Sequence, residues 1–374
     1  MTQKEKVNKI LLTGGHAATT ALATVEELIR RNSKKKDSWD IVWVGVNEAF
    51  EGKDIKTLES EALPKMGVKD YAIKTGRLQR KFTRYTIPSL AKVPLGITQA
   101  IKIIKKEKPN VVLSFGGFAS FPIVLAAYSF RIPIIIHEQT CGAGRANVYA
   151  SKFAKKIALA RKSSLSFFDS KKCKVVGNPV LTQITEIEAV KEKRDPLTIY
   201  IAGGSRGSIS LNEIVGKIIK NLVNDYIVIH HIGSLWVKEA ENIRARLGRK
   251  NNCYDTFERI APMQIDGIYN RADIIVSRAG ANTVSEIMIV KRPSLLIPLP
   301  ISASHDQKAN AQLAKEYGIS KVLVQDDLTP EKLLKEIKLI DKNWNKIVSK
   351  VARKKSSDIH ASQKLVNLVE EVLG

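Results

Sequence analysis

The strongest indication of the fold is Ile199-Tyr200-Ile201-Ala202-Gly203-Gly204-Ser205-Arg206-Gly207, an apolar run that is broken by glycines. A helix-like segment, 209–222, follows it directly. An apolar strand, a glycine turn and a helix open the phosphate-binding units of α/β folds. Glycine lets the backbone approach a ligand closely, and the helix N-terminus offers free N–H groups and partial positive charge. The stretch therefore predicts a strand with an anion site at its carboxyl end.

The same construction occurs near the start of the chain, about half its length away. There the run Ile10-Leu11-Leu12 breaks at Thr13-Gly14-Gly15-His16 and leads into a helix-like stretch, 20–30. Two such units in 374 residues predict two Rossmann-like domains that face each other across a central cleft. We expect domains over 1–180 and 181–354, because the polar, proline-bearing segment 177–195 makes a natural boundary. The last helix, within 355–374, is a candidate to pack back on the first domain.

Short β-rich runs alternate with helical stretches, which predicts an α/β protein with parallel sheets and crossover helices. The expected strands of the first half are 10–12, 41–46, 111–115, 134–137, 156–160 and 175–176. Those of the second half are 197–202, 226–232, 253–256, 274–277, 295–299 and 322–324. The expected helices include 26–32, 96–106, 234–247, 282–290, 307–317 and 361–373.

The composition is that of a globular chain with a strong basic excess. It has 44% hydrophobic residues and 61 Lys and Arg against 37 Asp and Glu, which gives a formal net charge of +24. The first residues lack an apolar signal core, and the apolar runs are too short to span a bilayer. The three cysteines, Cys141, Cys173 and Cys253, have no metal-type spacing. We therefore expect a reduced, cytosolic protein without a metal site.

Part of the basic excess is concentrated between Lys74 and Lys108, where ten basic residues stand against one acidic residue, Glu107. Aromatic and aliphatic side chains are interleaved with them, a pattern that favours contact with anionic lipid headgroups. The candidate membrane residues are Arg77, Arg80, Lys81 and Arg84. The alternative is a solvated lysine-rich face. Nucleic acid is disfavoured as a partner, because no recognition motif for it is present.

Two further strand ends carry unusual residues. Phe115-Gly116-Gly117-Phe118 makes a third glycine turn, and His137-Glu138-Gln139-Thr140 places four polar side chains in a row after a buried strand. Parallel α/β sheets bind ligands at the carboxyl ends of their strands. Both stretches therefore indicate the wall of a site, although the second could also be a capped loop.

The strongest block is 272–286, where a strand runs into a turn of small residues and then a helix. Asn282 or Thr283 can cap that helix, and the amides near Ala281 to Val284 can hold a phosphate. Glu286, one turn in, can accept hydrogen bonds from ribose hydroxyls. The alternative is that Glu286 only complements the helix dipole. A polar cluster, 304–310, opens another helix that we expect to face the same cleft.

These blocks stand in one order along residues 10 to about 320, and together they resemble the MurG family of glycosyltransferases, which add N-acetylglucosamine to lipid I in peptidoglycan synthesis. The landmarks that match are Thr13-Gly14-Gly15-His16, Phe115-Gly116-Gly117-Phe118, His137-Glu138-Gln139, Val176-Gly177-Asn178-Pro179-Val180, Gly203-Gly204-Ser205, Ser277-Arg278-Ala279-Gly280-Ala281 with Thr283-Val284-Ser285-Glu286, and His305-Asp306-Gln307.

The resemblance implies a GT-B fold without a required metal or other cofactor, peripheral on the cytoplasmic face of the cell membrane. The C-terminal half would bind UDP-N-acetylglucosamine, and the N-terminal half would bind a polyprenyl-diphosphate-linked acceptor. The implied donor residues are Gly203, Gly204, Ser205 and Gly207 at the diphosphate, Ala281, Asn282, Thr283, Val284 and Ser285 along diphosphate and sugar, Glu286 at the ribose and Gln307 at the transferred sugar. The implied acceptor side comprises Thr13, Gly14, Gly15, His16, Gly116, Gly117, Glu138 and Thr140.

The implied reaction is an inverting displacement, in which the acceptor hydroxyl attacks the anomeric carbon opposite UDP. His16 is the candidate general base, since the reference pKa of histidine lies near neutrality. In the alternative, Glu138 is the base and His16 only positions the acceptor. Amide N–H groups would stabilise the leaving diphosphate.

The chain departs from the family pattern at several positions, which are Leu12, Ala17 to Thr20, Thr140, Leu181 and Asn282. They leave open a related lipid glycosyltransferase with another donor sugar or a diacylglycerol-type acceptor. A nicotinamide-dependent oxidoreductase is disfavoured, because neither turn gives a full G-x-G-x-x-G pattern. A non-enzymatic basic protein would explain the charge but not the two site clusters.

Overall fold

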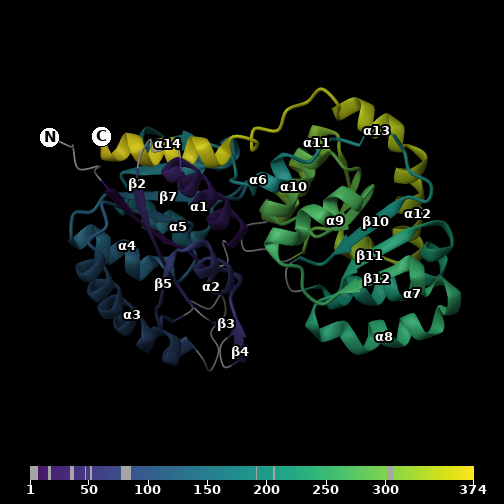
Figure 1. Cartoon of the computed structure of the whole chain (residues 1–374), viewed down its shortest axis with the longest axis horizontal. Helices are drawn as coiled ribbons and strands as arrows, with labels where there is room; N and C mark the ends of the chain where they lie inside the picture. Colours follow the sequence, from purple (N-terminus) through teal and green to yellow (C-terminus); the bar gives the residue numbers. More distant parts are fainter. Residues whose placement is uncertain are drawn as a thin grey trace. The chain divides into compact units, whose positions relative to one another are not determined.

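The computed structural model describes residues 7–15, 18–33, 38–46, 48–50, 53–76, 86–190, 192–204, 207–300 and 306–374. The chain forms two compact units (Figure 1). The N-terminal unit comprises Met1–Leu181 together with Ser357–Gly374, and the C-terminal unit comprises Thr182–Ser356. Among the described residues, no helix is both long and apolar enough to cross a bilayer.

The N-terminal unit is built on a seven-stranded sheet with the order β5-β2-β1-β6-β7-β8-β9, and every neighbouring pair is parallel. The order reverses between β1 and β6, which are paired with Thr13 opposite Ser114. In open α/β sheets this reversal point is where ligands bind. The strands are β1 (Val7–Thr13), β2 (Ser38–Gly45), β5 (Lys69–Ala72), β6 (Val111–Ser114), β7 (Ile134–Glu138), β8 (Lys156–Leu159) and β9 (Cys173–Val175).

The central strands of this sheet are buried on both faces, as expected for a parallel sheet between two layers of helices. Every residue of β6 and β7 is buried. The surrounding helices are α1 (Ala18–Ser33), α2 (Leu58–Ala62), α3 (Thr86–Glu107), α4 (Ser120–Ser129), α5 (Arg145–Ala150) and α14 (Ala361–Leu373). The last of these, α14, packs against α1 and contacts β6 and β8. Residues from both ends of the chain therefore complete one core.

The C-terminal unit is built on a six-stranded parallel sheet with the order β12-β11-β10-β13-β14-β15. Its order reverses between β10 and β13. The strands are β10 (Thr198–Ala202), β11 (Ile227–His231), β12 (Tyr254–Phe257), β13 (Ile274–Ser277), β14 (Ser294–Leu296) and β15 (Ser320–Val322). The helices are α6 (Thr182–Thr185), α7 (Ile209–Asp225), α8 (Val237–Arg246), α9 (Ile265–Arg271), α10 (Ala281–Val290), α11 (Asp306–Tyr317), α12 (Pro330–Lys342) and α13 (Trp344–Val351).

Alternate side chains of β10 point to different layers of this unit. Ile199 and Ile201 join the apolar core with Leu211 and Val215 of α7. Tyr200 lies instead against Tyr269 of α9, with the ring centroids 5.9 Å apart and the rings nearly perpendicular. The strand therefore supports a helix layer on each side of the sheet.

The prediction of two parallel-sheet α/β domains is confirmed. The expected strands occur with ends that shift by a few residues, but β5 and the antiparallel pair β3 (Glu48–Phe50) and β4 (Lys53–Lys56) were not predicted. The sequence of β5, Lys-Asp-Tyr-Ala, is polar because this edge strand is only partly buried. Helix α3 begins ten residues before its predicted start at Gly96 and contains Pro94 in its interior.

Candidate active site

Two glycine turns of the N-terminal unit touch each other at the carboxyl ends of β1 and β6. The N–H of Gly15 donates to the carbonyl of Gly116 at 2.9 Å. Gly116 and Gly117 have φ values of 80° and 89°, which favour glycine. A Cβ on Gly117 would lie 3.0 Å from the backbone of Gly15. Only glycine allows the turns to pack this closely, so the fold itself brings the candidate acceptor residues together.

The hydroxyl of Thr13 lies beside these turns at the end of β1. Its oxygen is buried and has no hydrogen-bond partner among the residues that the structure describes. Buried polar atoms normally have partners, so an orphan of this kind is a candidate ligand contact. His16, the candidate base, lies outside the described residues.

Glu138 ends β7 and is almost completely buried, with 2% of its surface exposed. One carboxylate oxygen accepts from the amide and the hydroxyl of Thr140, at 3.0 and 2.8 Å. The other accepts from the amide of Gly144 at 2.9 Å and from the side-chain amide of Asn147 at 2.8 Å. Glu138 therefore accepts four hydrogen bonds from residues 140–147 that follow it. One of the four donors is the hydroxyl of Thr140, a candidate acceptor residue.

His137 precedes Glu138 and lies fully buried, with Nε2 3.1 Å from the carbonyl of Gly177. Burial lowers the pKa of His137 to about 4, so that its imidazole is neutral at pH 7. Near it, Arg161 binds Asp358 through two hydrogen bonds of 2.7 and 2.6 Å. Asp358 also accepts from the amide of Asn178 at 3.0 Å. This buried network attaches the C-terminal segment to the N-terminal unit.

The glycine turn of the C-terminal unit follows β10. Gly204 and Gly207 have φ values of 92° and 74°, and the amide of Gly207 donates to the carbonyl of Gly204 at 3.0 Å. A Cβ on Gly207 would lie 2.3 Å from the carbonyl oxygen of Ile232, whereas a Cβ on Gly204 would meet no described atom within 4 Å. Gly204 therefore borders open space. Ser205 lies outside the described residues.

Helix α10 begins at Ala281, and its N-cap is Gly280 in an extended conformation with no side-chain cap. The expectation that Asn282 or Thr283 caps this helix is wrong, because both residues already lie in its first turn. At any helix N-terminus, the first-turn amides find no carbonyl acceptor in the helix itself. An uncapped helix N-terminus is suited to an anion. Val284 and Ser285 follow in the same helix, and the Ser285 hydroxyl donates to the Ala281 carbonyl at 3.0 Å.

Glu286 lies further along α10 and is 7% exposed. Tyr269 of α9 donates its hydroxyl to one carboxylate oxygen of Glu286 at 2.7 Å. Burial raises the pKa of Glu286, and the bond from Tyr269 lowers it. The described part of the chain gives Glu286 no basic partner. Unlike Glu138, this carboxylate therefore keeps free capacity to accept hydrogen bonds.

Arg278 was not predicted as a site residue, although it directly follows β13. It is 3% exposed. It donates to the hydroxyls of Ser208 and Ser210 at 2.8 and 2.9 Å, to the carbonyl of Ile297 at 3.2 Å and to the side-chain oxygen of Gln325 at 2.5 Å. The signal in the sequence was a lone arginine among small residues at the end of a buried strand.

Helix α11 is attached to the turn that precedes α10. The side-chain amide of Asn310 donates to the carbonyl of Ala279 at 3.2 Å. Gln307, in the first turn of α11, accepts from the amide of Leu299 at 3.0 Å. The candidate donor residues of α10 and α11 therefore belong to one corner of the C-terminal unit. Within the described ranges, no group of His, Cys, Asp and Glu side chains could hold a metal ion.

Two parallel α/β units, each with a glycine turn where its strand order reverses, form a fold of the GT-B class. The chain matches the glycosyltransferase family 28 N-terminal domain over residues 13–159 and the family's C-terminal domain over residues 198–369. It is 33% identical over 375 residues to the UDP-N-acetylglucosamine–N-acetylmuramyl-(pentapeptide) pyrophosphoryl-undecaprenol N-acetylglucosamine transferase of Clostridium kluyveri, covering 98% of this chain and 99% of that protein. The chain belongs to this family, the MurG glycosyltransferases of family 28.

Other relatives agree with this assignment. The enzyme of the same name from Clostridium perfringens is 32% identical over 361 residues, covering 94% of this chain and 95% of that protein. The crystal structure of Acinetobacter baumannii MurG matches with a TM-score of 0.70 at 24% identity, covering 97% of this chain and 99% of that one. A structure of S. aureus MnaA with UDP matches with a TM-score of 0.68 at 15% identity, covering 98% and 96%. The structural matches establish the fold.

Proposed function

We propose that this chain transfers N-acetylglucosamine from UDP-N-acetylglucosamine to lipid I, a polyprenyl-diphosphate-linked N-acetylmuramyl-peptide, and so forms lipid II in peptidoglycan synthesis. The observation that carries the proposal is the match to enzymes of this name along almost the whole of both chains. A partial match could reflect the nucleotide site alone, whereas this one includes both units.

The donor site that we propose lies at the N-termini of α7 and α10. The diphosphate would bind at the turn Gly203–Gly207 and at the first-turn amides of Ala281 to Thr283. Glu286 lies five residues after Ala281 in the same helix, which is roughly 7.5 Å along the helix axis. Its carboxylate would accept hydrogen bonds from the ribose hydroxyls, and Gln307 would contact the sugar. One helix would thus bind neighbouring parts of one nucleotide.

The acceptor site that we propose lies at the contacting glycine turns of β1 and β6. The acceptor hydroxyl would attack the anomeric carbon on the face opposite UDP, which inverts the configuration. We assign the general base to His16, because Glu138 uses both carboxylate oxygens to order its own loop. His16→Ala should lower turnover about 10²- to 10⁴-fold with little change in donor affinity. Near-normal turnover of this variant would mean that another residue is the general base.

We propose that the leaving diphosphate is stabilised by helix N-termini and amides and needs no metal ion. Turnover should then be the same in a chelating buffer and in a buffer with Mg²⁺. Loss of turnover in the chelator, and its recovery with Mg²⁺, would contradict this point alone.

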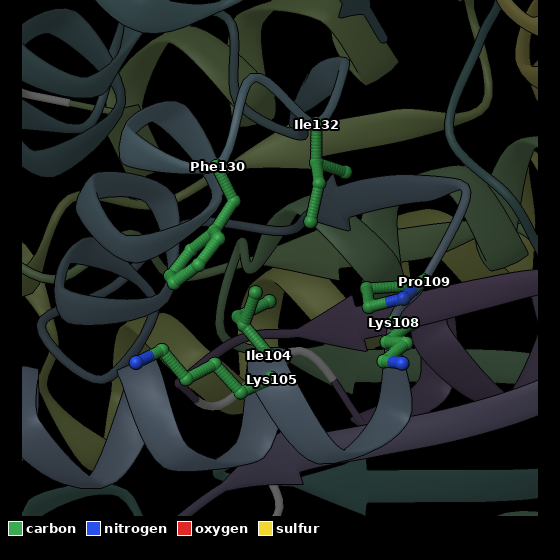
Figure 2. A pocket seen from close by; sticks show the side chains of 6 residues that line it. All are labelled: Ile104, Lys105, Lys108, Pro109, Phe130 and Ile132. Atoms are coloured by element: carbon green, nitrogen blue, oxygen red, sulfur yellow. The ribbon is translucent and has the colours of Figure 1, made fainter.

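We further propose that the N-terminal unit binds the anionic cytoplasmic face of the cell membrane as a peripheral protein. At the end of α3 and after α4, Figure 2 shows Phe130, Ile132, Ile104 and Pro109 around a shallow hollow with Lys105 and Lys108 at its side. The ammonium group of Lys105 lies 5.9 Å from the centre of the Phe130 ring. Exposed aromatic rings with lysines suit an interface with anionic lipid.

The candidate membrane residues Arg77, Arg80, Lys81 and Arg84 lie outside the described residues. Reversing their four charges should reduce binding to vesicles that contain anionic phospholipid, and vesicles of neutral lipid should bind neither protein well. A charge-reversed variant that binds anionic vesicles like the wild type would leave these residues as a solvated face.

The test of the proposed reaction is release of UDP from UDP-N-acetylglucosamine, with and without a short-chain lipid I analogue. Release that depends on the analogue, with formation of the disaccharide product, is expected. Binding of UDP without turnover would indicate another sugar or acceptor. No binding of UDP would overturn the proposal.

A further inference from the structure

Arg278 is a buried cation with no acidic partner in the part of the chain that the structure describes. It lies at the carboxyl end of β13, and all four of its hydrogen-bond acceptors are neutral oxygens. Its Nε is buried and has no described partner. Burial lowers the pKa of Arg278, and no carboxylate opposes that effect. A buried charge without a counter-ion is costly in free energy, so this arrangement calls for an explanation.

Other buried arginines of this chain have an acidic group nearby. In the N-terminal unit, Arg161 binds both oxygens of Asp358. In the C-terminal unit, Arg292 donates to three backbone carbonyls, and the carboxylate of Asp273 acts to raise its pKa. Arg292 lies at the amino ends of the strands, before β14, whereas Arg278 lies at the carboxyl ends, where ligands bind. Among the buried arginines that the structure describes, Arg278 alone has no acidic group nearby, and it lies at the end of the sheet that is suited to a ligand.

The contacts of Arg278 lead directly to the glycine turn after β10. Ser208 is the N-cap of α7, but its hydroxyl makes no cap hydrogen bond and accepts from Arg278 instead. Ser210, in the first turn, accepts from the same nitrogen. Arg278 thus holds the start of α7 in place while the first amides of the helix keep no side-chain cap.

A second uncapped helix begins close to Arg278 in the sequence. Only Ala279 separates it from Gly280, the N-cap of α10, which has no side-chain cap. Each helix N-terminus carries the equivalent of roughly half a positive charge. The guanidinium adds a full charge beside them, so that three sources of positive potential converge on one place. The positive potential at this place favours the binding of an anion, which would compensate it.

We propose that the counter-ion of Arg278 is the diphosphate of the nucleotide donor, and that Arg278 positions the start of α7 to receive it. This inference rests on the proposed function, which supplies the diphosphate. Arg278 would hold the start of α7 through its hydrogen bonds to Ser208 and Ser210, and its positive charge would attract the diphosphate. It is therefore a positioning residue, and it need not touch the ligand itself.

The test compares the affinities of the full-length protein for UDP, for inorganic pyrophosphate and for uridine. Arg278→Met should lower the affinity for UDP about 10- to 100-fold and change that for uridine less than about twofold. Pyrophosphate binding should be lost. Arg278→Lys keeps the charge without the four contacts and should give an intermediate loss. Without ligand, Arg278→Met should unfold at no lower temperature than the wild type, yet UDP should raise its melting temperature less.

Two control variants separate the charge from the packing. Arg292→Lys, at the other end of the strands, should lower the melting temperature and leave the ratio of UDP to uridine affinity unchanged. Ser208→Ala combined with Ser210→Ala keeps the cation and loses the anchor, so UDP affinity should fall less than in Arg278→Met. If Arg278→Met does not fold, Arg278→Lys and the double serine variant still test the proposal.

Equal losses of UDP and uridine affinity in the Arg278 variants would overturn the inference, because they would indicate a general structural role. Unchanged UDP affinity would overturn it as well. A wild-type protein that binds pyrophosphate but not UDP would contradict the proposed function and leave the anion site in place. A wild-type protein that binds neither would overturn both.

Discussion

The two units use the same architecture, but two buried charged side chains in each differ in how fully their hydrogen-bonding capacity is used. In the N-terminal unit, Glu138 accepts four hydrogen bonds from its own loop, and Arg161 is paired with Asp358. In the C-terminal unit, Glu286 accepts one hydrogen bond from Tyr269, and Arg278 has no described acid beside it. Charge and burial alone therefore do not identify a binding residue. We infer that the unused hydrogen-bonding capacity of a buried group is the better indicator.

The largest effect is expected from removing the paired arginine of the N-terminal unit. Arg161→Met leaves Asp358 buried without its partner, so the free energy of unfolding should fall by about 3–5 kcal/mol. Denaturant unfolding of the full chain measures this. The affinity for UDP should stay unchanged wherever the variant is folded. A large loss of UDP affinity in the folded variant would contradict the division between structural and ligand-binding charges.

The two glutamates provide the next test. Glu286→Gln should weaken UDP binding by about 1.5–3 kcal/mol, because a charged acceptor of hydrogen bonds is lost. The same change at Glu138 should destabilise the protein and leave UDP affinity unchanged. Calorimetric titration and thermal melts on both variants give the two readouts. If Glu286→Gln binds UDP normally, the carboxylate only complements the helix dipole.

One glycine from the turn of each unit should respond differently to an added methyl group. A Cβ on Gly116 would lie 2.3 Å from the side-chain oxygen of Asn147, whereas a Cβ on Gly204 would meet no described atom. Gly116→Ala should therefore cost about 1–3 kcal/mol from crowding in addition to the positive φ. Gly204→Ala should cost only about 1–2 kcal/mol for its positive φ. Because the added methyl group would enter the proposed diphosphate space, Gly204→Ala should nevertheless weaken UDP binding. Unfolding of both variants and titration of the second with UDP check this pair.

The smallest expected effect concerns pH. The pKa of Glu286 is raised by burial and lowered by the bond from Tyr269. Tyr200 is the other titratable group that interacts with this carboxylate. Only the ionised carboxylate can accept both ribose hydroxyls, so UDP affinity should fall as pH drops through the raised pKa. Tyr269→Phe removes the bond that favours ionisation, so the fall should begin at a higher pH. At neutral pH, Tyr269→Phe should lower the affinity for UDP about three- to tenfold.

The contribution of Glu286 to the free energy of unfolding should change with pH in the opposite direction from UDP affinity. A carboxyl group whose pKa is raised in the folded state binds its proton more tightly there, so Glu286 destabilises the folded protein as pH rises through that pKa. Glu286→Gln should remove this contribution. A UDP affinity of Tyr269→Phe with the pH dependence of the wild type would show that the tyrosine is only a packing residue.

The sequence was sufficient for the elements that local signals determine. Apolar runs and glycine turns predicted the strands around Ile10 and Ile199, and the period of α14 predicted that helix over its full length. Edge strand β5 was missed, because a half-exposed strand lacks a continuous apolar run. Asn282 and Thr283 were wrongly expected as caps, because residue type alone does not determine at which residue a helix begins.

The states of the site residues could not be predicted in the same way. Glu138 ends the buried strand β7, and Glu286 lies in α10 after the buried strand β13. The sequence does not show which of the two carboxylates is saturated by its neighbours. The partners of Arg278 come from positions as far apart as 208 and 325. Tertiary contacts between distant segments carry no signature in a single sequence, so the saturation of a buried group is known only once the fold is known.

The most direct test of the central claim is amide hydrogen exchange of the full-length protein with and without saturating UDP. We expect slower exchange in peptides that cover 203–210 and 278–286, because those amides and side chains would bind the nucleotide. Exchange in peptides that cover 114–118 and 138–147 should be unchanged, because both segments belong to the proposed acceptor site and Glu138 is already saturated by its own loop. Protection of the second pair without protection of the first would contradict the account.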